Sequence, residues 1–282
     1  MDLHFRMYSI IMKENPISTE ESEMSNVRIG FFDSGIGGIS VLSYARRRLP
    51  GADYIYYADT DHVPYGTKSA EDILRYSDAA VGFLAEQDVS AAVVACNTAT
   101  SMAIAYLREK YPFPIVGMEP AVKPAAAAHP GAEILVCATP VTIAGKKLHT
   151  LIENNYPSDE QPDLAGLPGL VTFAENGIFD CETVCGYLET VIDRTKNYAA
   201  VVLGCTHFGY FRDSFRELLG DVDLIDGTKG TVNRLISILE QNGIAVPEGQ
   251  GSTRFYQTGR PVDDPSTLAY YGELMARSEI LK

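Results

Sequence analysis

Short apolar runs alternate with helix-like stretches along the sequence from Val27 onward, and this alternation limits the possible folds more than any other feature. The run VRIGFF (27–32), for example, leads through the glycine turn DSGIGG (33–38) into an amphipathic stretch that reaches Arg48. Strands that alternate with helices in this way form parallel sheets covered by helices on both faces. The sequence therefore predicts an α/β fold built from doubly wound parallel sheets.

The same rhythm predicts the other elements. Ser69, followed by Asp72 three residues later, resembles a capping box and indicates the start of a helix. The Pro and Gly content of 158–169 predicts a loop. Further helices are expected after 96 up to Pro112, after 139 up to Tyr156, over 181–195, through Glu240 and at the C-terminal end. Further strands are expected at 54–58, 90–95, 114–118, 133–139, 170–175, 199–204, 223–226 and 254–259.

Two segments repeat one pattern. VVACNT (93–98) and VVLGCT (201–206) each place an apolar strand directly before a Cys and a Thr. A chain of 282 residues is also long enough for two domains, so we expect two related α/β halves. Residues 1–26 lack a secretory pattern, because their apolar stretch is short and an acidic polar run follows. We expect this segment to be a mobile tail or a regulatory appendage.

Charge and cysteine content limit the classes of partner that we expect and the cellular compartment. The chain has 23 Lys and Arg against 37 Asp and Glu, a net charge of −14. Such a surface repels phosphate backbones and anionic lipids, so we expect neither nucleic acid nor a membrane as partner. No stretch of about 20 residues is apolar enough to span a bilayer. The five cysteines are an odd, sparse set, which favours a reducing, cytoplasmic location over a disulfide framework.

Polar side chains follow four of the predicted strands, at the point where each strand ends. In open parallel sheets, ligands bind beyond the carboxyl ends of the strands, against helix N-termini. If the strands lie side by side, the four segments converge on one crevice. Their residues are Asp33-Ser34-Gly35, Pro64-Tyr65-Gly66, Cys96-Asn97-Thr98 and Cys205-Thr206-His207.

Cys96 and Cys205 stand at equivalent places in the two halves, each just before an expected helix start. A helix N-terminus stabilises a thiolate, which is a useful base near neutral pH. Two such groups on opposite sides of a bound carbon remove a proton from one face and return one to the other, and this inverts a stereocentre. His207 is placed to polarise Cys205, and Asp33 to assist Cys96. The alternatives are a strand-end histidine bonded to backbone and a turn or N-cap aspartate.

Other chemistries fit the residues less well. The turn DSGIGG lacks the third glycine of a dinucleotide fingerprint, and Asp33 stands where a pyrophosphate would approach. No CxxC or HxxxH spacing supports a metal site. No lysine stands at a strand-end motif, which disfavours pyridoxal phosphate. For Cys137, inside an apolar strand, and for Cys181 and Cys185, four residues apart on an expected helix, we predict packing roles.

Four motifs in order carry a family resemblance. The segments IGFFDSGIGG, YADTDHVPYGTKS, VVACNTAT and VVLGCTH, spread over residues 28 to about 240, resemble those of the glutamate racemases of bacterial cell-wall synthesis, within the aspartate/glutamate racemase superfamily. The resemblance implies cofactor-independent interconversion of L- and D-glutamate by two cysteines, with the D-isomer supplied to peptidoglycan. It also implies two α/β domains related by pseudo-twofold symmetry, an active site in the crevice between them, and a homodimer.

Carried over by position, the resemblance assigns roles and boundaries. Cys96 and Cys205 match the acid/base cysteines, and Asp33, His207 and Glu175 match their assisting residues. The expected domains are 27–120 with 227–282, and 121–226, after the extension 1–26. No metal or cofactor is expected. The residues matched to substrate binding are Asp33, Ser34, Tyr65, Gly66, Asn97, Thr98, Thr206 and His207.

The sequence departs from the family pattern in three places: 166–177, 138–143 and the Phe208-Gly209 pair. All proton-transfer residues are retained, so activity is expected, whereas substrate fit is left open. Two alternatives therefore stand beside a glutamate racemase. One is a racemase of aspartate or another acidic amino acid. The other is a non-catalytic thiol-regulatory binding protein, which would not exchange the α-hydrogen of any amino acid.

Overall fold

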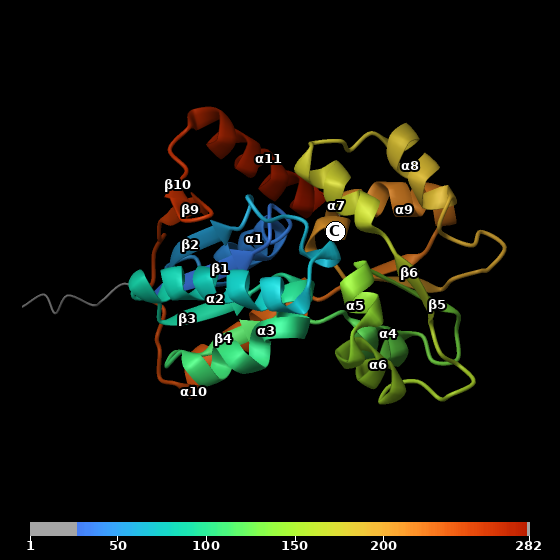
Figure 1. Cartoon of the computed structure of the whole chain (residues 1–282), viewed down its shortest axis with the longest axis horizontal. Helices are drawn as coiled ribbons and strands as arrows, with labels where there is room; N and C mark the ends of the chain where they lie inside the picture. Colours follow the sequence, from blue (N-terminus) through green and yellow to red (C-terminus); the bar gives the residue numbers. More distant parts are fainter. Residues whose placement is uncertain (1–26, 281–282) are drawn as a thin grey trace, which may run out of the picture.

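A computed structural model describes residues 27–280, which contain two β-sheets set side by side (Figure 1). The first sheet has the order β10-β9-β2-β1-β3-β4. All its pairs are parallel except β9 with β10. Its strands are β1 (Arg28–Asp33), β2 (Asp53–Ala58), β3 (Ala91–Val94), β4 (Ile115–Gly117), β9 (Thr253–Gln257) and β10 (Arg260–Pro261).

The second sheet is wholly parallel and has the order β6-β5-β7-β8. Its strands are β5 (Ile134–Ala138), β6 (Asp163–Gly166), β7 (Ala200–Leu203) and β8 (Asp223–Asp226). The predicted α/β class with parallel sheets is therefore confirmed.

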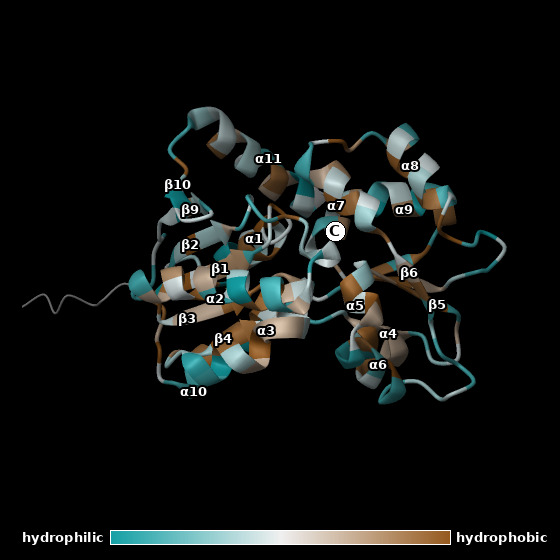
Figure 2. Cartoon of the chain, viewed as in Figure 1, coloured by the Kyte–Doolittle hydropathy of each residue, from teal (hydrophilic) through white to brown (hydrophobic). Residues whose placement is uncertain are grey.

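Helices cover both faces of the first sheet because its strands direct apolar side chains to both faces. In β1, Ile29 and Phe31 pack with α1 and its neighbours, whereas Phe32 packs with α2 and α3. In Figure 2 strands β3, β4 and β5 are largely brown, whereas β10 and the exposed parts of several helices are teal. The covering helices are α1 (Ile39–Arg48), α10 (Thr228–Gln241) and α11 (Pro265–Ile280) on one side, and α2 (Ala70–Glu86) and α3 (Asn97–Lys110) on the other.

The second sheet is covered in the same way. Val136 and Val202 face one helical layer, and Leu135 and Val201 face the other. The first layer includes α4 (Val122–Ala128) and α6 (Lys146–Glu153), and α5 (Pro140–Ala144) precedes α6. The second layer includes α7 (Pro168–Glu175), α8 (Cys181–Glu189) and α9 (Arg212–Leu219).

The C-terminal part of the chain returns to the first sheet. Strand β9 pairs in parallel with β2 over Tyr54–Ala58, and helices α10 and α11 both pack on α1. We propose that 27–120 with 227–282 form one domain and 121–226 the other. The predicted segment 1–26 lies outside the described residues.

Two expected elements were wrong. Residues 170–175, predicted as a strand, belong to helix α7, because Pro168 starts a helix whose buried positions are Leu170, Val171 and Ala174. Short apolar runs of this kind do not distinguish a strand from a buried helix. The predicted loop 158–169 contains strand β6, which pairs with β5 at the edge of the sheet.

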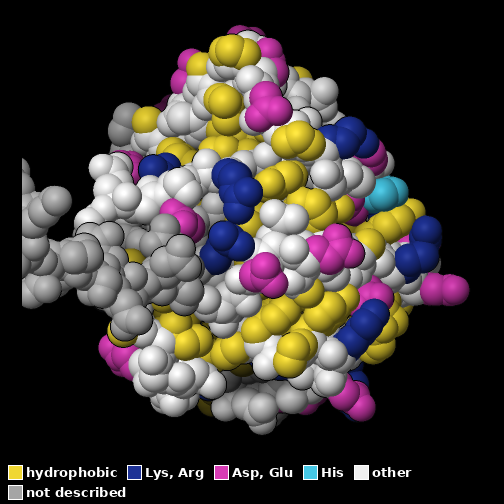
Figure 3. Space-filling model, turned by 90° about the vertical axis from the view of Figure 1, so that its left-hand side faces the viewer, with side chains coloured by type: hydrophobic (Ala, Val, Ile, Leu, Met, Phe, Trp, Pro, Cys, Tyr) yellow, Lys and Arg dark blue, Asp and Glu magenta, His cyan; other side chains and the backbone are white. Residues whose placement is uncertain are grey.

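The helix expected between 139 and Tyr156 is interrupted at Gly145, which separates α5 from α6. The capping box at Ser69 is confirmed, since its hydroxyl accepts a hydrogen bond from the backbone N–H of Asp72. Within residues 27–280, no helix has both the length and the apolar character needed to cross a bilayer. On the face shown in Figure 3, basic, acidic and hydrophobic side chains are intermixed.

Candidate active site

The four predicted strand-end segments come together between the two sheets. Asp33 is the last residue of β1, and Cys96 follows the neighbouring β3. The Cys96 thiol donates a hydrogen bond to Ser34 Oγ, with Sγ 3.5 Å from the oxygen. Cys96 also caps α3, because its sulfur accepts a hydrogen bond from the Ala99 N–H at 3.4 Å. This thiol is therefore held by one hydroxyl and one backbone donor.

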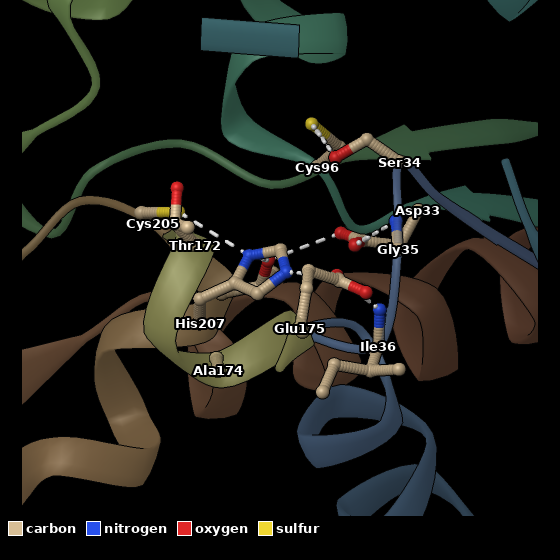
Figure 4. Close-up of polar contacts among 12 residues, drawn as sticks. Asp33, Ser34, Gly35, Ile36, Cys96, Thr172, Ala174, Glu175, Cys205 and His207 are labelled. Carbon is tan, nitrogen blue, oxygen red and sulfur yellow. Dashed lines mark hydrogen bonds and ion pairs between the residues drawn. The ribbon is translucent and has the colours of Figure 1, made fainter. Parts of the chain in front are cut away.

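Cys205 follows β7 and leads into a 3-10 helix (Thr206–Phe211), not directly into the α-helix that the sequence suggested. Its sulfur lies 3.6 Å from His207 Nδ1. The other ring nitrogen, Nε2, lies 2.6 Å from Glu175 Oε1 at the end of α7. Cys205, His207 and Glu175 thus form one chain of polar contacts (Figure 4).

Asp33 connects the Cys205 segment to the first sheet. Thr206 donates a hydrogen bond from Oγ1 to Asp33 Oδ2 at 3.1 Å, and the other carboxylate oxygen accepts from the Gly35 N–H at 3.0 Å. Glu175 makes a second link, since its Oε1 accepts from the Ile36 N–H at 2.9 Å. Contacts between the two sheets therefore pass directly through predicted site residues.

The glycine turn allows this close approach. A Cβ added at Gly37 would lie 2.3 Å from Thr206 Oγ1 and 2.7 Å from His207 Nδ1. A Cβ at Gly35 would overlap the Glu175 carboxylate. Glycine is therefore required here by space, and the turn serves as a contact surface between the sheets.

Burial and charge together change the pKa of the Cys96 thiol. Burial, with a further contribution from the Asp33 charge, raises the pKa of Cys96 to about 12. This is opposite to the sequence expectation of a helix-stabilised thiolate, because loss of solvent outweighs the N–H donor of Ala99. Cys205 contributes to the same rise, so the two thiols influence each other electrostatically across the site.

The surroundings of His207 favour its charged form. Burial lowers its pKa, but hydrogen bonds and charges from Cys205 and Glu175 outweigh burial and hold the pKa well above the usual value. The imidazolium form is therefore favoured beside Cys205. Burial raises the pKa of Asp33, against the opposing charge of His207.

Tyr65 and Gly66 lie in a 3-10 turn after β2, over Tyr65–Thr67. The buried Asp59 accepts the Tyr65 hydroxyl at 2.5 Å, His62 Nδ1 at 2.9 Å and the Thr258 hydroxyl at 3.2 Å. Asp59 was not singled out from the sequence. Its position directly after a buried strand was the available signal, because an aspartate there is a frequent anchor for a loop.

Asn97 and Thr98 begin α3 and are both buried. Thr98 Oγ1 lies 2.9 Å from Thr139 Oγ1, which belongs to the second sheet's half of the chain. Neither amide atom of Asn97 has a hydrogen-bond partner among the described residues. A buried amide of this kind costs about 1–3 kcal/mol unless a polar group binds it. Asn97 is therefore placed to receive a polar ligand group.

The remaining cysteines divide into two kinds. Cys137 is fully buried in β5, where a packing role was predicted. Cys181 is exposed and Cys185 is half-buried, so the predicted packing role is wrong for Cys181. Spacing placed both residues on one helix face but could not show which way that face points. Within residues 27–280, no three His, Cys, Asp or Glu side chains are grouped as a metal site.

Comparisons with known proteins agree with the family resemblance of the sequence motifs. A family model described as Asp/Glu/Hydantoin racemase matches residues 40–235. The glutamate racemase of Campylobacter curvus is 48% identical over 260 residues, which cover 89% of this chain and 97% of that relative. The chain belongs to the Asp/Glu/Hydantoin racemase family. It is therefore an isomerase of the racemase class, and the resemblance seen in the motifs is confirmed.

Solved structures of this family share the fold. Glutamate racemase from Francisella tularensis, in complex with D-glutamate, has a TM-score of 0.74 at 29% identity and covers 89% of this chain and 93% of its own. Escherichia coli glutamate racemase, in complex with L-glutamate and the activator UDP-MurNAc-ala, also has a TM-score of 0.74 at 29% identity, covering 87% and 95%. The two-domain racemase fold is thus established for this chain.

Proposed function

We propose that this protein is a glutamate racemase that interconverts L- and D-glutamate with Cys96 and Cys205 as its two bases and without a cofactor. The observation that carries the proposal is the pair of thiols at corresponding strand ends of two sheets, with differing polar partners on each side. Relatives of the same family bind D-glutamate or L-glutamate. Glutamate is therefore the substrate that we assign.

Proton transfer begins on the Cys205 side for one isomer. A thiolate at Cys205, beside the imidazolium of His207, removes the α-proton from one face of the substrate. The Cys96 thiol, which its raised pKa keeps protonated, then delivers a proton to the opposite face. After this step the sulfur of Cys205 holds the abstracted proton and Cys96 is the thiolate. The reverse direction uses the same two groups with their roles exchanged.

Charge develops on the substrate carboxylate as the α-proton leaves. Hydrogen-bond donors fixed in advance stabilise such charge more effectively than water, because they need no reorientation during the step. We assign this task to the Asn97 amide, whose polar atoms have no partner among the described residues, and to the hydroxyls of Ser34 and Thr98. Thr206, whose hydroxyl donates to Asp33, lines the substrate position. Tyr65 and Gly66 bind substrate from the turn after β2.

His207, Glu175 and Asp33 act through the thiols or the substrate groups. Glu175 holds the proton on His207 Nε2, which leaves Nδ1–H directed at the Cys205 sulfur. Asp33 fixes Thr206 through a hydrogen bond across the two sheets. In the cell we propose that the enzyme works in the cytoplasm as a homodimer and supplies D-glutamate for peptidoglycan.

Exchange of the α-hydrogen in deuterated water tests this proposal directly. L- and D-glutamate are each incubated with the purified full chain and no added cofactor, and deuterium at the α-carbon and the isomer ratio are measured together. We expect both isomers to gain deuterium and to reach the same mixture. Equal or greater turnover of aspartate would instead assign the site to an aspartate racemase. Absence of exchange with every acidic amino acid would overturn racemase activity.

A further inference from the structure

Two cysteines outside the active site form a close pair in the first two turns of helix α8. Cys181 is the first residue of this helix and Cys185 lies four residues later. Their sulfur atoms are 2.7 Å apart, and Cys185 also lies 3.7 Å from the carbonyl oxygen of Ser214 on α9. Neither sulfur contributes to the proton chemistry of the racemase site. The pair is therefore a feature that the proposed function does not explain.

Accessibility distinguishes this pair from the other thiols. Cys181 is exposed and Cys185 is half-buried, whereas Cys96, Cys137 and Cys205 are buried. A water-soluble thiol reagent therefore meets Cys181 first. Because a second thiol stands in contact with that sulfur, a reaction at Cys181 is followed by a rapid intramolecular step.

The spacing of the pair favours bond formation at small structural cost. A disulfide has an S–S length of about 2.05 Å, so the two sulfurs need to approach by well under 1 Å. Helical neighbours four residues apart have Cβ atoms about 5–6 Å apart, wider than the separation usual in a disulfide. The first turn of α8 must therefore tighten. The first turn of a helix has few internal backbone hydrogen bonds to oppose such a change.

We propose that Cys181 and Cys185 are a dithiol modification site, which small-molecule disulfides oxidise to a disulfide within α8. The Cys181 thiolate attacks one sulfur of the reagent, forms a mixed disulfide and releases one reagent thiolate. Cys185 then loses its proton and attacks the Cys181 sulfur, which releases the second reagent thiolate. The pair loses two electrons and two protons, and one reagent disulfide becomes two reagent thiols.

Electrostatics agree with this order of attack. Burial, and then the hydrogen bond and charge of Cys181, raise the pKa of Cys185 to about 12. Cys185 therefore keeps its proton, and Cys181, the exposed member of the pair, makes the first attack. Once Cys181 is part of a mixed disulfide, it no longer carries a like charge that opposes ionisation of Cys185.

The pair is connected to the racemase site by a short segment. Only five residues separate Cys181 from Glu175 along the chain. Tyr187, on the same helix α8, accepts a hydrogen bond from the Gly169 N–H at the start of α7, the helix that ends at Glu175. Because the segment between Glu175 and Cys181 is this short, we expect tightening of the first turn of α8 to shift Glu175 relative to His207. We expect oxidation of the pair to lower kcat about threefold or more, and reduction to restore it.

Mass analysis after treatment with oxidised glutathione tests the site itself. The reduced full chain is treated, quenched by alkylation and digested without reductant. We expect the peptide that contains both cysteines to lose two hydrogens, with Cys96, Cys137 and Cys205 unmodified. The variant Cys185→Ser is expected to stop at a mixed disulfide on Cys181, and Cys181→Ser to remain largely unreacted. This readout needs no racemase activity, so it stands apart from the proposed function.

Two results would overturn the inference. One is a Cys181–Cys185 peptide that stays fully reduced while a buried cysteine reacts. The other is a wild-type product with glutathione on both cysteines and no internal disulfide. Activity measured on the same samples tests the connection to Glu175: wild type should lose turnover reversibly and Cys181→Ser should not. Equal turnover of oxidised and reduced wild type would show that the site does not act on Glu175.

Discussion

The Cys96 side and the Cys205 side of the site start from the same local sequence, an apolar strand followed by Cys and a polar residue, and end in different surroundings. Cys96 caps a long helix and contacts Ser34, a neutral hydroxyl. Cys205 enters a 3-10 turn and contacts His207, whose other nitrogen is held by Glu175. The two cysteines therefore occupy equivalent positions in the two sheets, but the side chains that contact them differ in charge.

Under the mechanism that we propose, this difference provides one acid and one base from two identical side chains. Burial, together with the nearby Asp33 charge, keeps the Cys96 thiol protonated, because both disfavour a thiolate. An imidazolium supplies Cys205 with the partner that a thiolate needs.

Removal of either thiol should have the largest effect. Cys96→Ala and Cys205→Ala are each expected to lower racemisation by at least about 100-fold, because a positioned acid or base contributes roughly 100-fold to 10,000-fold. Each variant retains one thiol, so each should still exchange the α-hydrogen of the one isomer that faces it. Deuterium incorporation into L- and D-glutamate measures this. Full racemisation by either variant would contradict the two-thiol mechanism.

Gly37→Ala tests the contact between the glycine turn and the Cys205 side. The new Cβ would overlap Thr206 and His207, so we expect about a 100-fold loss of kcat/KM and about 1–3 kcal/mol of destabilisation. Gly209→Ala is the matched control, because among residues 27–280 no atom outside its local backbone lies within 4 Å of a Cβ at that position. Kinetics and thermal unfolding of both variants measure the difference. Equal behaviour of the two would show that the close approach is unimportant.

Glu175→Gln and Ser34→Ala separate the two sides. Loss of the Glu175 charge removes one cause of the raised pKa of His207, so His207 should lose its proton at lower pH. We expect the alkaline limb of kcat/KM to move to lower pH and activity to fall about 10-fold to 100-fold. Ser34→Ala should leave that limb in place. A pH–rate profile that is unchanged in Glu175→Gln would argue against the assigned role of Glu175.

Asp59→Asn should have the smallest effect, because Asp59 holds the turn that carries Tyr65 and touches neither thiol. The amide cannot accept from Tyr65, His62 and Thr258 as the carboxylate does. We expect KM for glutamate to rise about 10-fold with kcat within about twofold of wild type, given the usual value of a hydrogen bond to a charged group. Steady-state kinetics checks this, and a fall confined to kcat would contradict it.

Sequence patterns predicted the layered sheets and the strand-end positions because both follow from local periodicity and from the geometry of parallel sheets. Cys96 and Cys205 were singled out in this way, from their positions at the ends of two predicted strands. The sequence did not show that α7 is a helix, since the apolar run 170–175 fits a helix or a strand equally well. Glu175 was reached through family resemblance alone.

The pKa shifts in the site could also not be predicted from the sequence. The raised pKa of Cys96 depends on complete burial and on Asp33, whose place beside it follows from sheet order. Asp59 and Thr258 are about 200 residues apart in a chain of 282, so no local pattern links them. The solvent-facing orientation of Cys181 likewise depends on how α8 packs on α9.

The pairing of β9 with β2 has a consequence for biosynthesis. Ribosomes synthesise a chain from its N-terminus, so both thiols are made well before Thr258. Thr258 follows β9 and binds Asp59. Until those late residues emerge, β2 is an open edge and the Tyr65 turn lacks one of its anchors. A nascent chain therefore carries its reactive groups for some time before it holds the substrate turn in place, and competence for catalysis is expected only after Thr258 has emerged.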